Sequence, residues 1–232
     1  RVSVGAGERD GGRRMRAGEP LILWDWTFNH LGDIGGYALE HIWLTTIAVG
    51  VGFVLAAVMS LIIRQAPTLF GPVTWVAGVL YTIPSLALFA MLVPITGLSV
   101  LTAEIGLVSY TLSILVRNMV AGLRSVPPDV REAATGMGYS PWQMLWHIEL
   151  PLALVVIIAG VRVAVVTTIG LVAVTMVIGE GGLGRLIRMG IDQFFSTPLI
   201  IGAVLSIVLA VVCDGALVLV QRLATPWTRP AV

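Results

Sequence analysis

Residues 132–151 are the part of this chain whose residue types and spacing are the most specific, although they contain no catalytic arrangement. The segment EAATGMGYSPWQMLWHIELP places charged and aromatic side chains between two long apolar stretches. No Ser-His-Asp or HExxH arrangement and no GxxxxGK[ST] phosphate loop occurs in the sequence. The spaced residues of the segment are Glu132, Ala133, Ala134, Gly138, Ile148, Leu150 and Pro151.

Two short helices are predicted within this segment. Pro127 and Pro128 end the preceding helix, because proline lacks an N–H group and clashes with the preceding turn. Glu132 then lies early in a new helix, where the positive end of the dipole favours a carboxylate. Gly138 suits a left-handed helix terminus, and residues 140–143 supply a cap, a first-turn proline and a capping-box glutamine. The two helices should meet near Gly138 as a sharp hairpin.

The second helix of the hairpin carries large side chains on one predicted face. That face consists of Trp142, Leu145, Trp146 and Glu149. An amphipathic helix lying on the inner leaflet would show a similar face. A rigid projecting hairpin could instead contact a protein partner and transmit motion into the spans.

The elements around the hairpin are predicted to be membrane-spanning helices. The chain is 57% hydrophobic and 12% charged, with a mean hydropathy of +0.94, whereas soluble domains carry about 25% charge. About 20 apolar residues cross the hydrocarbon core, and backbone groups in lipid must bond within a helix. Five stretches qualify: 42–63, 70–95, 100–120, 152–178 and 199–220. The expected fold is an all-α polytopic membrane protein with five spans.

The two ends differ from the spans. Residues 1–20 are polar, lack the apolar region of a signal peptide, and contain Met15 as a candidate start, which would make residues 1–14 a leader or an added sequence. Residues 21–41 are rich in aromatic side chains and are expected at the membrane interface. The membrane domain is then 42–222, with the hairpin loop at 127–151 and a tail at 223–232.

Arginine positions predict the orientation. With the N-terminus outside, the cytoplasmic segments hold six arginines and the external loops only two, as the positive-inside rule requires. The six are Arg64, Arg117, Arg124, Arg131, Arg222 and Arg229, and the two are Arg185 and Arg188. The hairpin and the C-terminus are therefore expected in the cytoplasm.

The spacing in residues 132–151 resembles the EAA loop of permease subunits of binding-protein-dependent ABC importers, the element that docks on the ATP-hydrolysing subunit. Residues 81–92, 115–118 and 178–187 are similar to the osmoprotectant branch, whose members import glycine betaine, carnitine, choline and related compounds. The likeness covers residues 39–222. It implies a five-span type I importer permease core in a bacterial inner membrane, paired with a second permease subunit that is either identical or different.

The resemblance also assigns partners and residues. It implies that Glu132, Ala133, Ala134, Gly138, Ile148, Leu150 and Pro151 couple to the ATP-binding subunit, and we add Trp142 from the predicted docking face. ATP and Mg are expected in that partner, so this chain needs no cofactor and is not an enzyme. A separate external binding protein is expected to deliver the solute.

Other functions stay open at this point. An importer of another small solute, such as methionine or ergothioneine, is the nearest alternative. A membrane scaffold or an intramembrane enzyme would belong to a different class, but no catalytic cluster is present at one depth. A net charge of +1 gives no nucleic-acid signal, and one cysteine with three scattered histidines predicts no metal site.

Two groups of polar residues lie within the predicted spans. Tyr81, Thr82, Pro84 and Ser85 lie mid-span, where a proline bends a helix. They form either a packing kink or a polar lining of the transport pathway. Arg162 lies mid-way along the fourth span and Asp214 in the fifth, so we expect an ion pair that joins them. Glu104 and Arg117, near the ends of the third span, are expected to snorkel.

Small residues are predicted to pack helices together. One stripe is Ala48, Gly52, Ala56 and Ser60, and another is Gly202, Ser206 and Ala210. Packing within one subunit is favoured over a seam between two subunits. The glycines at 179, 181, 182 and 184 are expected to form a tight outer turn.

Overall fold

The structure is a computed structural model that describes residues 20–228, and all regular elements of that part are helical. In chain order the helices are α1 (Trp24–Asn29), α2 (Leu31–Gln65), α3 (Phe70–Thr82), α4 (Ser85–Thr96), α5 (Val100–Arg124), α6 (Pro128–Gly136), α7 (Pro141–Met144), α8 (Leu150–Val174), α9 (Gly184–Asp192) and α10 (Ser196–Ala224). A π-helix, Leu145–Glu149, joins α7 to α8. The predicted tail at 1–20, except Pro20, and residues 229–232 lie outside the described residues.

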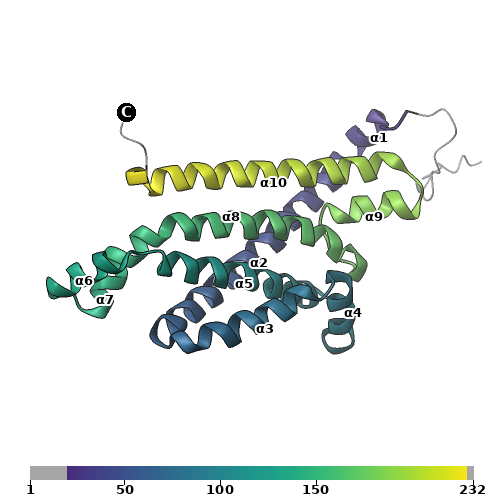
Figure 1. The fold of residues 1–232 in the computed structure, drawn as a ribbon. Helices are drawn as coiled ribbons and strands as arrows, with labels where there is room; N and C mark the ends of the chain where they lie inside the picture. The colour runs from purple at the N-terminus through teal and green to yellow at the C-terminus, as the bar shows by residue number, and fades with distance from the viewer. Residues whose placement is uncertain (1–19, 229–232) are drawn as a thin grey trace, which may run out of the picture.

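Four helices are long and apolar enough to cross a membrane, and a fifth span results if α3 and α4 count together. Residues 141–178 form one continuous helical run, so the second arm of the hairpin leads into the fourth span without a loop. The hairpin helices α6 and α7 lie at one end of the molecule, and α4 and α9 lie at the other (Figure 1). Below, these are called the hairpin end and the opposite end.

The predicted second span at 70–95 is wrong as a continuous helix. It is broken between Thr82 and Ser85, and α3 and α4 meet at an angle of 96°. Pro84 cannot donate a backbone hydrogen bond, and Ile83 and Pro84 adopt extended ψ angles of 125° and 134°. The residue before a proline is pushed out of the helical region, so the bend becomes a break.

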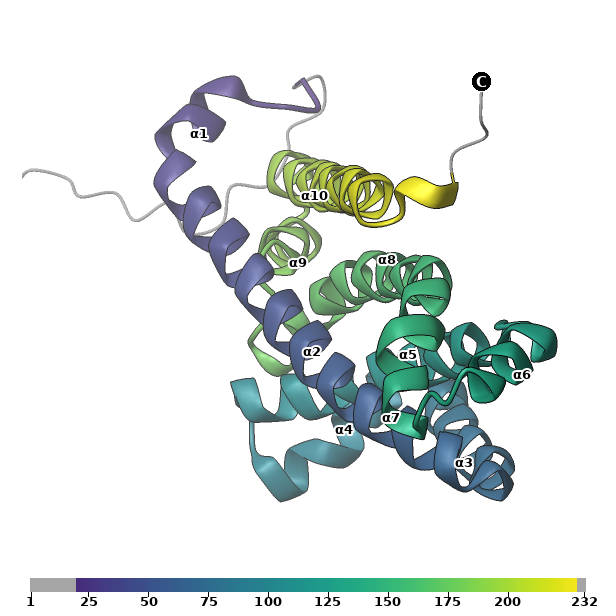
Figure 2. The same cartoon turned by 90° about the vertical axis from the view of Figure 1, so that its left-hand side faces the viewer.

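Packing of α2, α5 and α8 forms the core, with α2 crossing the other long helices obliquely (Figure 2). The stripe Ala48, Gly52, Ala56 and Ser60 is buried within the chain. A Cβ atom at Gly52 would lie 2.8 Å from Cγ2 of Thr111 on α5, so the helices approach closely. The prediction that this stripe packs spans within one subunit is confirmed.

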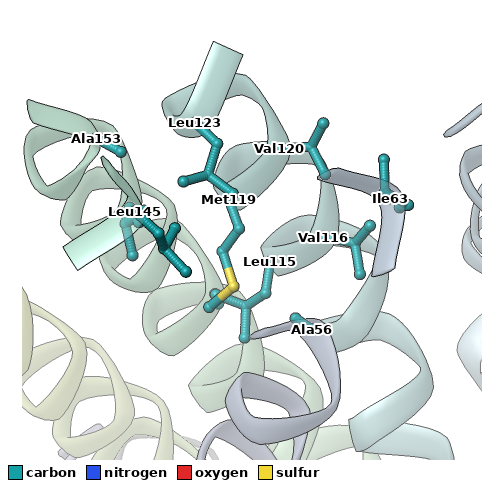
Figure 3. Close-up of a cluster of buried hydrophobic side chains, with 11 residues drawn as sticks. Ala56, Ile63, Leu115, Val116, Met119, Val120, Leu123, Leu145 and Ala153 are labelled. Atoms are coloured by element: carbon teal, nitrogen blue, oxygen red, sulfur yellow. The ribbon is translucent and has the colours of Figure 1, made fainter. Parts of the chain in front are cut away.

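One buried cluster fixes the hairpin to this core. Figure 3 shows side chains from α2, α5 and the hairpin run converging around Met119. Leu145 of the π-helix belongs to this cluster and is almost fully buried. Large apolar groups buried in this way stabilise by about 1.5–3 kcal/mol each, so the base of the hairpin is not a free loop.

The opposite end contains a helix, α9, where the sequence predicts only an external loop. α9 packs against α10, and Gly190 lies so close to it that a Cβ atom would be 2.7 Å from the backbone N of Leu199. The predicted interfacial segment 21–41 comprises α1 and the first turns of α2. Trp26 within it is buried against Phe195, with ring centroids 5.5 Å apart.

Candidate functional site

The first arm of the hairpin ends in the manner that its sequence predicts. Gly138 has a φ of +85°, the N–H of Tyr139 donates to the carbonyl of Ala134, and the N–H of Gly138 donates to that of Thr135. These two bonds define a Schellman terminus, in which a glycine occupies the left-handed position. A Cβ atom at Gly138 would meet nothing within 4 Å. Any cost of a side chain there within this chain is therefore conformational.

The second arm begins with the predicted capping box. The N–H of Gln143 donates to Oγ of Ser140, and the side-chain oxygen of Gln143 accepts from the N–H of Ser140. Pro141 occupies the first helical turn. These reciprocal bonds satisfy two donors that a helix start otherwise leaves unpaired. Together with the Schellman terminus they set a rigid angle between the two arms.

The predicted docking face of the second arm divides into two. Trp142 and Trp146 are 61% and 51% exposed and lie edge to face, 5.7 Å apart, whereas Leu145 and Glu149 are 3% and 4% exposed. The π-helix adds a residue to one turn at this point, a feature that is frequent at functional sites. One side of the arm therefore anchors it and the other presents two tryptophans.

The spaced residues of the hairpin also separate by exposure. Glu132, Ala133 and Gly138 are exposed, and the Glu132 carboxylate forms no ion pair or side-chain hydrogen bond within residues 20–228. Ala134 is fully buried, so its methyl group packs inside the hairpin rather than facing a partner. Ile148, Leu150 and Pro151 are half-buried.

A charge network that the sequence did not reveal ties the hairpin to two other helices. Nε of Arg64, at the end of α2, donates to Glu149 at 2.6 Å, and Nε of Arg131, on α6, lies 3.2 Å from the other Glu149 oxygen. Arg64 also donates to the carbonyl of Pro141, and Arg131 to that of Leu123 at the end of α5. Glu149 is thus the shared centre of contacts among α2, α5, α6 and α7. The only sequence signal was a carboxylate on an otherwise apolar helix face.

The polar residues around Pro84 do not form one cluster. The Tyr110 hydroxyl donates to the carbonyl of Ile83, which the break exposes, and Thr82 donates to Val79 within its own helix. Tyr81 lies edge to face with Tyr110 at 5.7 Å, and Ser85 begins α4. The break is therefore secured by α5. A pathway role for Tyr81, Thr82, Pro84 and Ser85 stays a prediction.

Arg162 and Asp214 are brought together between α8 and α10. Nε and Nη2 of Arg162 donate to the two Asp214 oxygens at 2.8 and 2.9 Å, a bidentate geometry. The pair lines a groove of about 580 Å³ and is about one-third exposed. Asp214 uses both oxygens on Arg162, which fits the predicted structural ion pair.

The two residues expected to snorkel differ in burial, and Arg117 is exposed. Both carboxyl oxygens of Glu104 are buried and without a hydrogen bond in the described part of the chain. Arg117 donates to the carbonyl of Thr74 on α3. The snorkelling prediction is wrong for Glu104, because helix packing covers its side chain.

The opposite end holds a second charge network. Nη2 of Arg185 lies 3.0 Å from Glu40 and 3.1 Å from Glu180, and Glu40 also accepts from the N–H of Gly182. The predicted tight glycine turn is present, since Gly179, Gly181 and Gly182 all have positive φ. A Cβ atom at Gly182 would lie 2.6 Å from the backbone N of His41, so the turn is packed tightly on α2.

The comparisons with known proteins agree with this architecture. The family described as "Binding-protein-dependent transport system inner membrane component" matches residues 48–225, which include the hairpin and all five apolar stretches in whole or in part. The chain belongs to this family. As a member, it is a multi-pass membrane protein and a transport permease subunit.

Three curated relatives are named as permease proteins for osmoprotectants, carnitine or choline. The chain is 39% identical to the osmoprotectant import permease protein OsmW of Salmonella typhimurium, over 86% of this chain and 97% of that one. It is 36% identical to the carnitine transport permease protein OpuCD of Listeria monocytogenes, over 83% and 88%. It is 33% identical to the choline transport system permease protein OpuBB of Bacillus subtilis, over 84% and 90%.

Solved structures share the fold. An inward-facing structure of the MetNI methionine ABC transporter matches with a TM-score of 0.73 at 21% identity, covering 81% of this chain and 94% of that one. A second crystal form of the same transporter matches with a TM-score of 0.72. The expected type I importer permease fold is confirmed.

Proposed function

We propose that this chain is the permease subunit of an ATP-driven importer of osmoprotectants, such as glycine betaine, carnitine or choline. The observation that carries the proposal is the hairpin, a rigid and partly exposed knob continuous with a membrane-spanning helix. Relatives 33–39% identical over more than four-fifths of the chain carry osmoprotectant, carnitine or choline in their names, which supports the substrate class. The methionine transporter shares only 21% identity with this chain, so it supports the fold and not the substrate.

The hairpin would transmit movement of the ATP-binding subunit to the membrane-spanning helices. Its exposed side, with Glu132, Ala133, Trp142 and Trp146, would contact the ATP-binding subunit, where ATP and Mg bind. Its second arm runs into α8 without an intervening loop, so displacement of Trp142 moves the fourth span directly. Glu149 would carry the same displacement to α2 through Arg64.

The remaining partners follow from the assembly. A second permease subunit, the same chain or a different one, would complete the pathway, and an external binding protein would deliver the solute. Recognition of a quaternary ammonium by aromatic rings would belong to that binding protein. We place the hairpin end in the cytoplasm and the N-terminus outside, in accord with the arginine distribution.

The test is ATP-dependent uptake of labelled glycine betaine in cells without their own betaine importers, after this chain and its partner subunits are restored. Gly138→Trp should abolish uptake because a bulky side chain would separate the hairpin from its partner. Gly138→Asn is the matched control, since asparagine tolerates the left-handed conformation and adds little bulk. It should retain most of the uptake.

The outcomes separate the parts of the proposal. Full uptake with Gly138→Trp would exclude the docking role of the hairpin. No betaine uptake by the wild-type complex, with carnitine and choline also inactive and ATP still hydrolysed, would exclude the substrate class and keep the importer.

A further inference from the structure

A cavity of about 370 Å³ lies at the hairpin end, between α2, α5 and the hairpin. Its polar lining consists of Arg64, Arg124, Arg131, Glu149 and Ser60. A single water needs on the order of 10–15 Å³ of such space, so the cavity accommodates a larger group. The coupling role described above assigns no ligand to it.

The lining carries an excess of positive charge. Three guanidinium groups face one carboxylate, which leaves two positive charges in excess. Arg64 and Arg131 share Glu149. The Arg124 side chain forms no ion pair or hydrogen bond within residues 20–228, and its guanidinium carbon lies 4.1 Å from the centre of the Phe70 ring. Arg124 is exposed, and its contact with Phe70 holds the guanidinium beside the cavity, where its N–H groups can turn from water to an anion.

Two further donors in the lining lack a hydrogen-bond acceptor. Ser60 is 3% exposed, and its Oγ atom is buried without a hydrogen bond. Nε of Arg131 is buried and close to Glu149, yet it makes no hydrogen bond of acceptable geometry. Buried polar groups in native proteins nearly always have a partner, and a water or an acceptor group in the cavity would supply one.

We propose that this cavity binds a phosphate group. A phosphate offers several acceptor oxygens and negative charge, and guanidinium groups match its geometry with paired N–H donors. Ile63, Val120 and Leu123 line the cavity beside the arginines, and these apolar side chains could contact the acyl chain of a lipid whose headgroup enters the cavity. Two sources share this chemistry, the headgroup of an anionic lipid and free phosphate. The proposal goes beyond the transport function and adds a ligand site to the hairpin end.

Occupancy would act on the hairpin. The phosphate would share Arg64 and Arg131 with Glu149, so a bound ligand weakens the contacts that fix the second arm to α2 and α6. Binding and hairpin position are then linked, because any ligand that favours one arrangement shifts the population toward it.

The experiment measures equilibrium binding by titration calorimetry to the purified complex of permease and ATP-binding subunits in a maltoside detergent. The probes are inorganic phosphate, dioctanoyl phosphatidylglycerol and dioctanoylglycerol, which lacks the phosphate. Arg124→Gln should weaken binding about tenfold, the loss expected for one charge-assisted contact. Ser60→Ala should weaken it several-fold. Arg117→Gln is the matched control, since Arg117 lies on the same helix, binds Thr74 and does not line the cavity.

Each outcome decides the proposal or its source. Binding of the phospholipid alone, lost with Arg124→Gln and kept with Arg117→Gln, supports the lipid headgroup, and binding of inorganic phosphate with the same variant pattern supports free phosphate. The proposal is overturned if neither phosphate compound binds or if Arg117→Gln weakens binding as much as Arg124→Gln. It is also overturned if the isolated permease binds phosphate and the assembled complex does not, since the partner subunit then fills the cavity. Melting temperatures of the variants show whether a loss of binding is caused by unfolding. Ser60→Ala changes the side-chain volume little, so weaker binding by this variant tests the site independently of Arg124.

Discussion

The two ends of the molecule hold charge networks of opposite composition. At the hairpin end one carboxylate, Glu149, is shared by Arg64 and Arg131. At the opposite end one guanidinium, Arg185, is shared by Glu40 and Glu180. In each network, a single charge pairs with two charges of the opposite sign.

The centres differ in burial, and the difference indicates what each network does. The Glu149 side chain is 6% exposed, whereas that of Arg185 is 38% exposed. Removing one partner of a buried pair leaves an uncompensated charge, but exposed pairs contribute little because water replaces the partner. The hairpin network therefore links the hairpin firmly to α2 and α6. The opposite network mainly stabilises the glycine turn against α2.

Removing a partner of the buried centre should have the largest effect. Arg64→Gln leaves the buried Glu149 carboxylate with Arg131 alone, and we expect a loss of about 2 kcal/mol in stability. Uptake should fall well below that of the wild type, because the hairpin loses its contact with α2. The measurements are thermal unfolding of the purified complex and betaine uptake per complex. Unchanged stability and uptake would remove the distinction between the ends.

Arg162 and Asp214 form a third kind of contact, a pair of one cation and one anion in which neither charge is shared with another residue of the described chain. Arg162→Gln alone should lower membrane abundance several-fold. Asp214→Asn in the same chain should add little further damage, because the contact is already lost. Quantitative immunoblots of both single variants and the double variant measure this. Additive losses would show that the two residues act independently.

The exposed centre should give the smallest effect. Arg185→Gln should cost about 1 kcal/mol, since Glu40 keeps its hydrogen bond from Gly182 and water solvates both carboxylates. Arg188→Gln on the same helix is the control, because its pair with Asp192 is more exposed still. Unfolding midpoints compare the two. A loss for Arg185→Gln as large as for Arg64→Gln would contradict the argument from burial.

Features encoded by neighbouring residues could be predicted from the sequence. The turn at Gly138 and the cap at Ser140 depend on residues within one or two turns, and both were predicted where they occur. The bidentate pair of Arg162 and Asp214 could be anticipated because charges within spans are costly and seek one another.

The rest depends on packing that no local signal encodes. Arg64 and Glu149 lie 85 positions apart, and their pairing requires the end of α2 to meet the π-helix before α8. Pro84 indicated a bend, but the angle of 96° also depends on α5, whose Tyr110 binds the freed carbonyl. The division of the docking face arises from the π-helix, and the pattern of residues 142–149 predicts an ordinary helix equally well.

The most direct test of the account is disulfide or bifunctional cross-linking between the hairpin and the ATP-binding subunit from two adjacent positions. In a Cys213→Ser background, Ala133→Cys and Ala134→Cys differ by one residue, yet Ala133 is exposed and Ala134 is fully buried. We expect Ala133→Cys to cross-link to the ATP-binding subunit, with a yield that changes when ATP is added. Ala134→Cys and Ile191→Cys at the opposite end should not cross-link. No cross-link from Ala133→Cys, or equal yields from all three positions, would contradict the assignment of the hairpin as the coupling element.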